Sequence, residues 1–181
     1  MRLVLRNLLN RPVTEAPPSA DDAEIAELAA KLDRSARRKL GRSLAIREVD
    51  AGSCNGCELE VNALGNPYYD FERFGLRFVA SPRHADVLLV TGPVTNNMRL
   101  ALERTFKATP DPKWVVALGD CAAGCGVFQA SPQCVGGVAN VLPVDLVIKG
   151  CPPPPVEILK GLLALLQQNA TNPVRKAPRS A

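Results

Sequence analysis

Three short apolar segments of this chain each lead into a cysteine. They are residues 44–49 before Cys54, residues 114–118 before Cys121 and residues 144–148 before Cys151. Segments with helical periodicity lie between them, which is typical of strands that alternate with helices. Loops at the carboxyl ends of parallel strands share one edge of a sheet, and ligands bind where the strand order reverses. The pattern therefore predicts an α/β fold, an open parallel sheet with helices on both faces, and places cysteines of three loops together.

Further periodic segments complete the expected sheet and its helices. Strands are expected at 76–80 and 85–90, and helices at 59–64, 95–107 and 156–167. With 181 residues, the chain is long enough for one domain of about 100 to 150 residues with tails. The predicted organisation is an N-terminal segment at 1–43, a folded domain at 44–168 and a flexible basic tail at 169–181.

The N-terminal segment combines an amphipathic start, a linker and a basic helix. Leucines of residues 1–11 share one helical face among arginines. Two interpretations are open: contact with an anionic membrane surface or a membrane subunit, or packing on the chain's own domain. A proline-rich linker at 13–20 precedes a helix with an acidic first turn at 21–24 and a basic end at 31–42.

Composition narrows the class of protein and its compartment. The chain is 46% hydrophobic and 22% charged, as soluble globular proteins are. With 4% aromatic residues and a net charge of +4, nucleic-acid binding is not expected. We find neither a signal peptide, nor a twin-arginine leader, nor an apolar run of membrane-spanning length, so we expect a cytoplasmic location. In that reducing compartment, six cysteines indicate metal ligation or buried thiols rather than a disulfide framework.

The pair Cys54 and Cys57 has the spacing of a metal-binding turn. This C-x-x-C spacing suits zinc, an iron-sulfur cluster or a redox disulfide. With Cys121 and Cys151 it makes four thiolate ligands. Zinc ribbons usually supply two such pairs, whereas here two ligands are lone cysteines on long loops. Proline after Cys151 is a recurring feature of iron-sulfur ligands, so a 4Fe-4S cluster fits this set better than zinc.

Two cysteines remain outside this set. Cys125 follows Cys121 by four residues and is the rival ligand if a helical turn joins them. The alternative for Cys125 and Cys134 is that each is a small buried hydrophobic residue.

Seven spaced motifs carry a resemblance to a known family. They are CNGCELE at 54–60, SPRHAD at 81–86, VTGPVT at 90–95, GDC at 119–121, VGG at 135–137, LPVD at 142–145 and GCPPP at 150–154. Together they resemble the small subunit of membrane-bound, energy-converting nickel-iron hydrogenases, with the formate hydrogenlyase type as the nearest guess. The same superfamily contains the cluster-bearing subunit of respiratory complex I. The resemblance runs from about residue 49 to residue 166.

The resemblance implies a fold, a cofactor and partners. The fold is flavodoxin-like, and one 4Fe-4S cluster is held by Cys54, Cys57, Cys121 and Cys151. The implied partners are a large subunit with a nickel-iron site, a ferredoxin-like iron-sulfur subunit and membrane-embedded subunits. The chain is then an electron-transfer subunit on the cytoplasmic side of the inner membrane, without catalytic residues of its own.

Two other functions stay open. A complex I-like subunit would carry the terminal cluster that reduces quinone, although such subunits typically have adjacent cysteines where this chain has Cys54 and Cys57. A zinc-stabilised structural domain is the second alternative. Dinucleotide binding is disfavoured, because no G-x-G-x-x-G loop follows the first strand.

A few polar residues have weaker assignments. Glu58 and Glu60 follow the cysteine pair and are candidates for a proton relay, or are acids favoured in the first turn of a helix. His84, the single histidine, is expected to be structural rather than a ligand. Asp86 and Arg83 are expected to hold the start of a strand or to contact the partner subunit.

Overall fold

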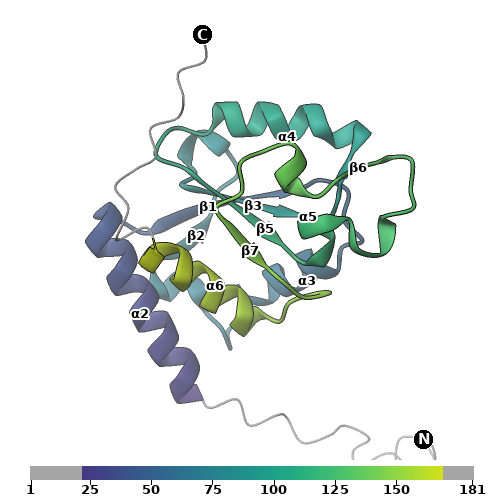
Figure 1. The fold of residues 1–181 in the computed structure, drawn as a ribbon. Coiled ribbons are helices and arrows are strands. Elements are labelled where there is room, and N and C mark those ends of the chain that lie inside the picture. The colour runs from purple at the N-terminus through teal and green to yellow at the C-terminus, as the bar shows by residue number, and fades with distance from the viewer. Residues whose placement is uncertain (1–21, 169–181) are drawn as a thin grey trace, which may run out of the picture.

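The computed structural model describes residues 22–168, which form a parallel sheet between two layers of helices (Figure 1). Five strands follow the order β2-β1-β3-β5-β7, and every neighbouring pair is parallel. They are β1 (Leu44–Asp50), β2 (Leu76–Phe78), β3 (Val87–Thr91), β5 (Trp114–Leu118) and β7 (Leu146–Ile148). This is the flavodoxin-like order, in which the direction of winding reverses between β1 and β3. The expected α/β fold is confirmed.

Helices cover both faces of this sheet, and all but the short helix Asp120–Gly124, which was not predicted, lie near their predicted positions. Helix α4 (Asn96–Ala108) covers one face, while α2 (Asp22–Leu40) and α6 (Pro155–Gln168) lie on the other (Figure 1). The remaining helices are α3 (Gly56–Ala63) and the short α5 (Asp120–Gly124). None of the helices in the described range is both long and apolar enough to cross a bilayer.

The hydrophobic core is divided by the sheet into two layers. On one side, buried side chains of α2, α3 and α6 pack on Leu44, Ile46 and Leu89. On the other, α4 and α5 pack on Leu88 and Val90. Strands β3 and β5 are buried along their whole length, as expected for the centre of a sheet covered on both faces.

Helix α2 belongs to this core through its apolar stripe. Leu28, Leu32 and Ala36 are buried in the same cluster as Leu159 and Leu162 of α6. The division of the chain at residues 43 and 168 stays a prediction. The amphipathic segment at 1–11 and the basic tail at 169–181 lie outside the described residues.

A small second sheet was not expected from the sequence. Strands β4 (Val94–Thr95) and β6 (Cys134–Gly136) pair antiparallel beside the carboxyl edge of the main sheet. Strands of two and three residues are too short to show an alternating pattern, which explains the omission.

At the amino-terminal end of the sheet, hydrogen bonds to one carboxylate connect the start of β3 with β1 and with Arg42. Asp86, directly before β3, accepts hydrogen bonds from the Ala45 backbone N–H at 2.9 Å and from the Arg42 guanidinium at 2.6 and 2.9 Å. Its own N–H donates to the Ala45 carbonyl at 2.8 Å. The expectation that Asp86 holds the start of a strand is confirmed.

Candidate metal centre

The carboxyl edge of the sheet holds a cavity of about 100 Å³ formed by loops that follow four strands. It is lined by Ser53, Cys54, Gly56, Cys57, Gly92, Asp120, Cys121, Gly150, Cys151 and Pro152. All four predicted ligand cysteines are in this lining, and they are the chain's four free cysteines. The cavity adjoins the loops after β1 and β3, where the strand order reverses and where such folds bind ligands.

The loop after β1 is held by hydrogen bonds among its own polar side chains. Asp50 accepts from the backbone N–H groups of Gly52 and Ser53 at 2.8 and 2.7 Å. The Ser53 hydroxyl accepts from the Asn55 N–H at 2.8 Å and donates to Glu58 at 2.5 Å. Asn55 has φ 71° and caps the start of α3 directly before Gly56, so Cys54 and Cys57 lie on either side of a fixed turn.

The loops after β5 and β7 are tied directly to each other. Gly119 N–H donates to the Ile148 carbonyl at 2.7 Å, and Asp120 N–H donates to the Gly150 carbonyl at 2.9 Å. In return, Gly150 N–H donates to the Asp120 carboxylate at 3.0 Å. These bonds fix Cys121, which follows Asp120, relative to the loop that carries Cys151.

Two glycines leave the space that the thiols occupy. A Cβ atom on Gly119 would lie 2.7 Å from the sulfur of Cys57, and one on Gly126 would lie 2.8 Å from the sulfur of Cys121. Both glycines have left-handed backbones, with φ of 91° and 50°, a conformation that other residues adopt only at a cost. The backbone therefore forms a cradle around sulfur atoms, and the residues present fit a group held by four thiolates.

The four thiols differ in their exposure to solvent. Cys121 is 8% exposed, Cys57 is half-buried, and Cys54 and Cys151 are exposed. The site therefore has a closed inner side and an open outer side.

The protein disfavours bare thiolates at the inner side. Burial raises the pKa of Cys57 to about 12, and the negative charges of Glu58 and of the other three thiolates act in the same direction. Burial also raises the pKa of Cys121, although a hydrogen bond from the Val127 backbone opposes the shift. Thiolates gathered in such a site need a compensating positive charge, which a bound metal group supplies. Binding of a metal group to these thiols would release protons.

The four cysteines lie around a cavity. Within residues 22–168, no group of three or more His, Cys, Asp or Glu side chains is arranged so that it could hold a metal ion. The thiols instead surround a volume between three loops. His84 is exposed in the turn Pro82–His84 and is not among the residues that line the cavity.

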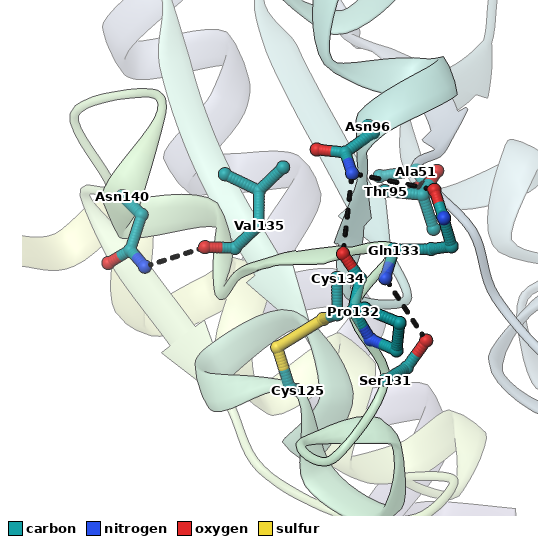
Figure 2. The surroundings of a disulfide bond; sticks show 10 residues. All are labelled: Ala51, Thr95, Asn96, Cys125, Ser131, Pro132, Gln133, Cys134, Val135 and Asn140. Carbon is teal, nitrogen blue, oxygen red and sulfur yellow. Dashed lines mark hydrogen bonds between the residues drawn. A yellow bond between two sulfur atoms is a disulfide. The ribbon is translucent and has the colours of Figure 1, made fainter.

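Cys125 and Cys134 form a disulfide bond beside this cavity (Figure 2). The sequence-based expectation that all six cysteines are ligands or buried thiols is wrong for this pair. Cys125, the rival ligand, has its sulfur bonded to Cys134 instead. The cause is the small second sheet, because β6 returns to β4 and brings Cys134 to the end of α5. This return could not be predicted from so short a strand.

Two acids near the cavity each have one buried oxygen atom without a hydrogen-bond partner in the part of the chain that the structure describes. One carboxylate oxygen of Glu58 accepts from Ser53. Its other oxygen, and one oxygen of Glu48 on β1, have no hydrogen-bond partner among the described residues. Glu60 is half-buried on α3 and does not line the cavity.

Glu48 is a polar residue that the sequence reasoning missed. Burial, aided by the charges of Glu58 and Asp50 and opposed by Arg47, raises the pKa of Glu48 to about 7. Glu48 also lines a second cavity of about 280 Å³ beside the end of β2. The available signal was a pair of charged residues, Arg47 and Glu48, between the apolar residues of the strand that leads to Cys54.

Fold and site together define an open α/β protein in which cysteine-bearing loops line a cavity at the carboxyl edge of the sheet. Within that class, residues 54–165 match the family described as NADH ubiquinone oxidoreductase, 20 Kd subunit. The match covers more than half of the chain. The chain therefore belongs to this family.

Three relatives in sequence show how far the similarity extends. The probable membrane-bound hydrogenase subunit mbhJ of Pyrococcus furiosus is 47% identical over 131 residues, covering 72% of this chain and 78% of the relative. Formate hydrogenlyase subunit 7 of Escherichia coli is 43% identical over 154 residues, covering 83% of this chain and 59% of the relative. An uncharacterised protein of Methanocaldococcus jannaschii is 48% identical over 122 residues, covering 67% of this chain and 82% of the relative.

Solved structures share the same architecture. A chain of the membrane-bound sulfane sulfur reductase, described as an archaeal respiratory membrane complex, matches with a TM-score of 0.65 and 33% identity. The match covers 79% of this chain and 77% of that one. A chain of an NAD+-reducing nickel-iron hydrogenase matches with a TM-score of 0.56 at 19% identity, over 77% of this chain and 99% of that one. The second similarity concerns the fold alone.

Proposed function

We propose that this chain is the electron-transfer subunit of a membrane-bound nickel-iron hydrogenase and carries one 4Fe-4S cluster. One observation carries the proposal: four free cysteines from three separate loops line a single cavity. The proposed ligands of the cluster are Cys54, Cys57, Cys121 and Cys151. The names of the relatives support the hydrogenase context, since two of them are subunits of a membrane-bound hydrogenase and of formate hydrogenlyase.

The residues of the chain have separate tasks in this function. A bound cluster supplies one-electron transfer. The four thiolates hold it, and the turn from Asp50 to Glu58 fixes two of them. The apolar strands behind the loops exclude water from the inner side, and burial and hydrogen bonds to sulfur set the potential of such a centre.

The open side of the site is where we place the large subunit with the nickel-iron centre. Cys54 and Cys151 are exposed there. Leu59 follows Cys57 by two residues, and Val127 donates its N–H to the sulfur of Cys121. These two apolar side chains are 61% and 80% exposed, and a partner surface would bury them. A ferredoxin-like subunit then accepts the electrons, and membrane-embedded subunits place the assembly on the cytoplasmic side of the inner membrane.

Glu58 and Glu60 are the acids that we propose for proton exchange next to the site. Glu58 has the stronger support, because it is hydrogen-bonded to Ser53 of the ligand loop and has one buried oxygen without a partner among the described residues. We expect Glu58→Gln to slow hydrogen turnover more than Glu60→Gln does, measured with the intact complex. Unchanged turnover in both variants would reject the relay.

A quinone-linked role is the second candidate, favoured by the family description as a subunit of NADH ubiquinone oxidoreductase. In that role the same cluster would pass electrons to quinone, and the partner would lack nickel. The four-thiol site is common to both functions. The partner's metal content therefore distinguishes them.

The test uses the full chain, tagged and purified without oxygen from the membranes of its own host. We expect a brown protein with iron, sulfide and nickel, and reduction of a viologen dye by hydrogen. Cys57→Ala should lose the cluster and the dye reduction, whereas His84→Ala, in an exposed turn away from the cavity, should keep both. Iron and sulfide without nickel would support the quinone-linked role, and a colourless protein with stoichiometric zinc would refute both.

A further inference from the structure

The Cys125–Cys134 disulfide is attached at one end to the segment that holds a cluster ligand. Cys125 caps α5, the short helix that carries Cys121, and its N–H donates to the Cys121 carbonyl at 2.8 Å. The next residue, Gly126, packs against the Cys121 sulfur so closely that a Cβ there would lie 2.8 Å from it. The position of the Cys125 backbone therefore fixes the surroundings of the most buried ligand sulfur.

At its other end the disulfide is attached to the small second sheet. Cys134 pairs with Thr95 of β4. Thr95 donates both its N–H and its hydroxyl to the Ala51 carbonyl, each at 3.0 Å. Asn96 adds a hydrogen bond from its N–H to the Gln133 carbonyl at 2.9 Å. Ala51 begins the loop that leads to Cys54. The disulfide therefore connects the segment of Cys121 to β6, and the pairing of β6 with β4 and the hydrogen bonds of Thr95 continue this connection to the loop of Cys54.

The two cysteines of the bond are unequally exposed. Cys125 is 5% exposed, whereas Cys134 is half-buried and follows the exposed residues Pro132 and Gln133. Figure 2 shows the bond between Cys125, which follows α5, and Cys134 of β6. An external thiolate therefore reaches the Cys134 sulfur more readily, and Cys125 is the leaving group.

We propose that the Cys125–Cys134 bond is a thiol–disulfide exchange site for a dithiol reductant, and that its opening releases the segment that holds Cys121. The inference goes beyond the proposed function, which uses neither cysteine. It rests on the linked contacts of Cys125 and Thr95 with the two ligand loops. Disulfides in reducing compartments are usually catalytic or redox-sensing rather than structural, and the proposed location is such a compartment.

The exchange is a two-electron reaction in two steps. One thiolate of the reductant attacks the Cys134 sulfur, the bond between the two cysteines breaks, and Cys125 leaves as a thiolate that takes up a proton. The second thiol of the reductant then attacks the mixed disulfide and releases Cys134 as a thiol. The reductant is oxidised to its own disulfide, and the protein gains two electrons and two protons.

The experiment treats the full-length chain, purified without oxygen as the complex, with dithiothreitol. Trapping with iodoacetamide and peptide mass spectrometry should show that Cys125 and Cys134 do not react before reduction, because they are disulfide-bonded, and are alkylated after it. Reduction should accelerate iron release to a chelator several-fold. Cys134→Ser should release iron at the fast rate from the start and should not respond to dithiothreitol, while Ser131→Ala, in the same loop, should behave as the unaltered chain does.

Two results would overturn the inference. One is that both cysteines stay open to iodoacetamide even after treatment with oxidised glutathione. The other is that iron release is the same with the bond closed, reduced or removed by Cys134→Ser. If the chain binds no iron, the proposed function fails, and the modification rate of Cys121 relative to Cys57 decides instead. A faster relative rate after reduction supports the inference, and an unchanged rate overturns it.

Discussion

At the amino-terminal end of the sheet, the carboxylate of Asp86 is 4% exposed and both its oxygens accept hydrogen bonds. At the carboxyl end, free thiols surround a cavity, and one buried oxygen of Glu58 has no partner among the described residues. Both ends gather polar groups from several strands. The first end satisfies these groups with hydrogen bonds within the chain, whereas the second leaves free thiols and a buried carboxylate oxygen without a hydrogen-bond partner among the described residues.

The largest expected effect comes from filling the space beside the thiols at the carboxyl end of the sheet. In Gly119→Ala the new Cβ would lie 2.7 Å from the Cys57 sulfur on a left-handed backbone. We expect metal affinity to fall by roughly 10- to 100-fold, the typical cost of disturbing the shell around metal ligands. Iron and sulfide analysis of the purified complex measures the effect.

Gly124→Ala is the matched control for this change. Gly124 lies in α5, and a Cβ there would meet nothing within 4 Å. Cluster content should therefore stay at the level of the unaltered chain. Equal iron content in the two variants would mean that Gly119 does not shape the site.

A smaller effect, on stability rather than on the site, is expected from breaking the amino-terminal end. Asp86→Ala removes the acceptor of the Ala45 N–H, which is buried, and the partner of Arg42. Leaving a buried donor unsatisfied costs about 1–3 kcal/mol, so urea unfolding of the metal-free chain should show a loss of about 2–3 kcal/mol.

Arg42→Ala separates the two contributions at this end. It removes only the half-exposed partner of the ion pair and should cost about 1 kcal/mol or less. Iron per folded chain should be normal in both variants, because Asp86 lies at the opposite edge of the sheet. A cluster lost in Asp86→Ala without unfolding would contradict the separation of the two ends.

An effect smaller than that of Asp86→Ala is expected at Glu48, through the pH dependence of stability. Because the folded pKa is raised from 4.5 to about 7, the folded chain binds this proton more tightly than the unfolded chain does. The contribution of this group to the free energy of unfolding is thus fully present below about pH 4.5, and it is lost as pH rises through about 7. Because Glu48 is only half-buried, solvent screening reduces this contribution, and Glu48→Gln should be more stable than the unaltered chain by about 1–2 kcal/mol above pH 7.

Denaturant unfolding at several pH values tests this expectation. The gain of Glu48→Gln should shrink toward pH 4.5. Glu103→Gln removes a surface ion pair with Arg99 and should change stability by less than about 0.5 kcal/mol. A gain for Glu48→Gln that is the same at all these pH values would show that its carboxyl group is not the cause.

Much of the fold followed from local patterns in the sequence. Strand β5 begins and ends where its apolar run does, and β1 extends only one residue beyond the predicted segment. Such runs are reliable because a strand buried on both faces admits few polar residues. The prediction that three loops bring four cysteines together depended on this sheet, and all four line one cavity.

The features that were missed depend on contacts between distant segments. Nothing local to Cys134 indicates that β6 pairs with β4 and carries the sulfur to Cys125. The same holds for Glu48, whose sequence neighbours do not reveal that α3 brings Glu58 near it.

By itself, the sequence determined where the main strands and helices lie along the chain. It also determined which four cysteines follow a strand or lie at the start of the helix after it. These are local properties, set by the periodicity of apolar residues and by the turn residues next to each cysteine. Only the tertiary structure decided which thiols are buried, which pair is oxidised and which acids lack a partner among the described residues. Those properties depend on how segments far apart in the chain pack together, because burial and proximity change the pKa and the hydrogen bonding of a group whose sequence is the same.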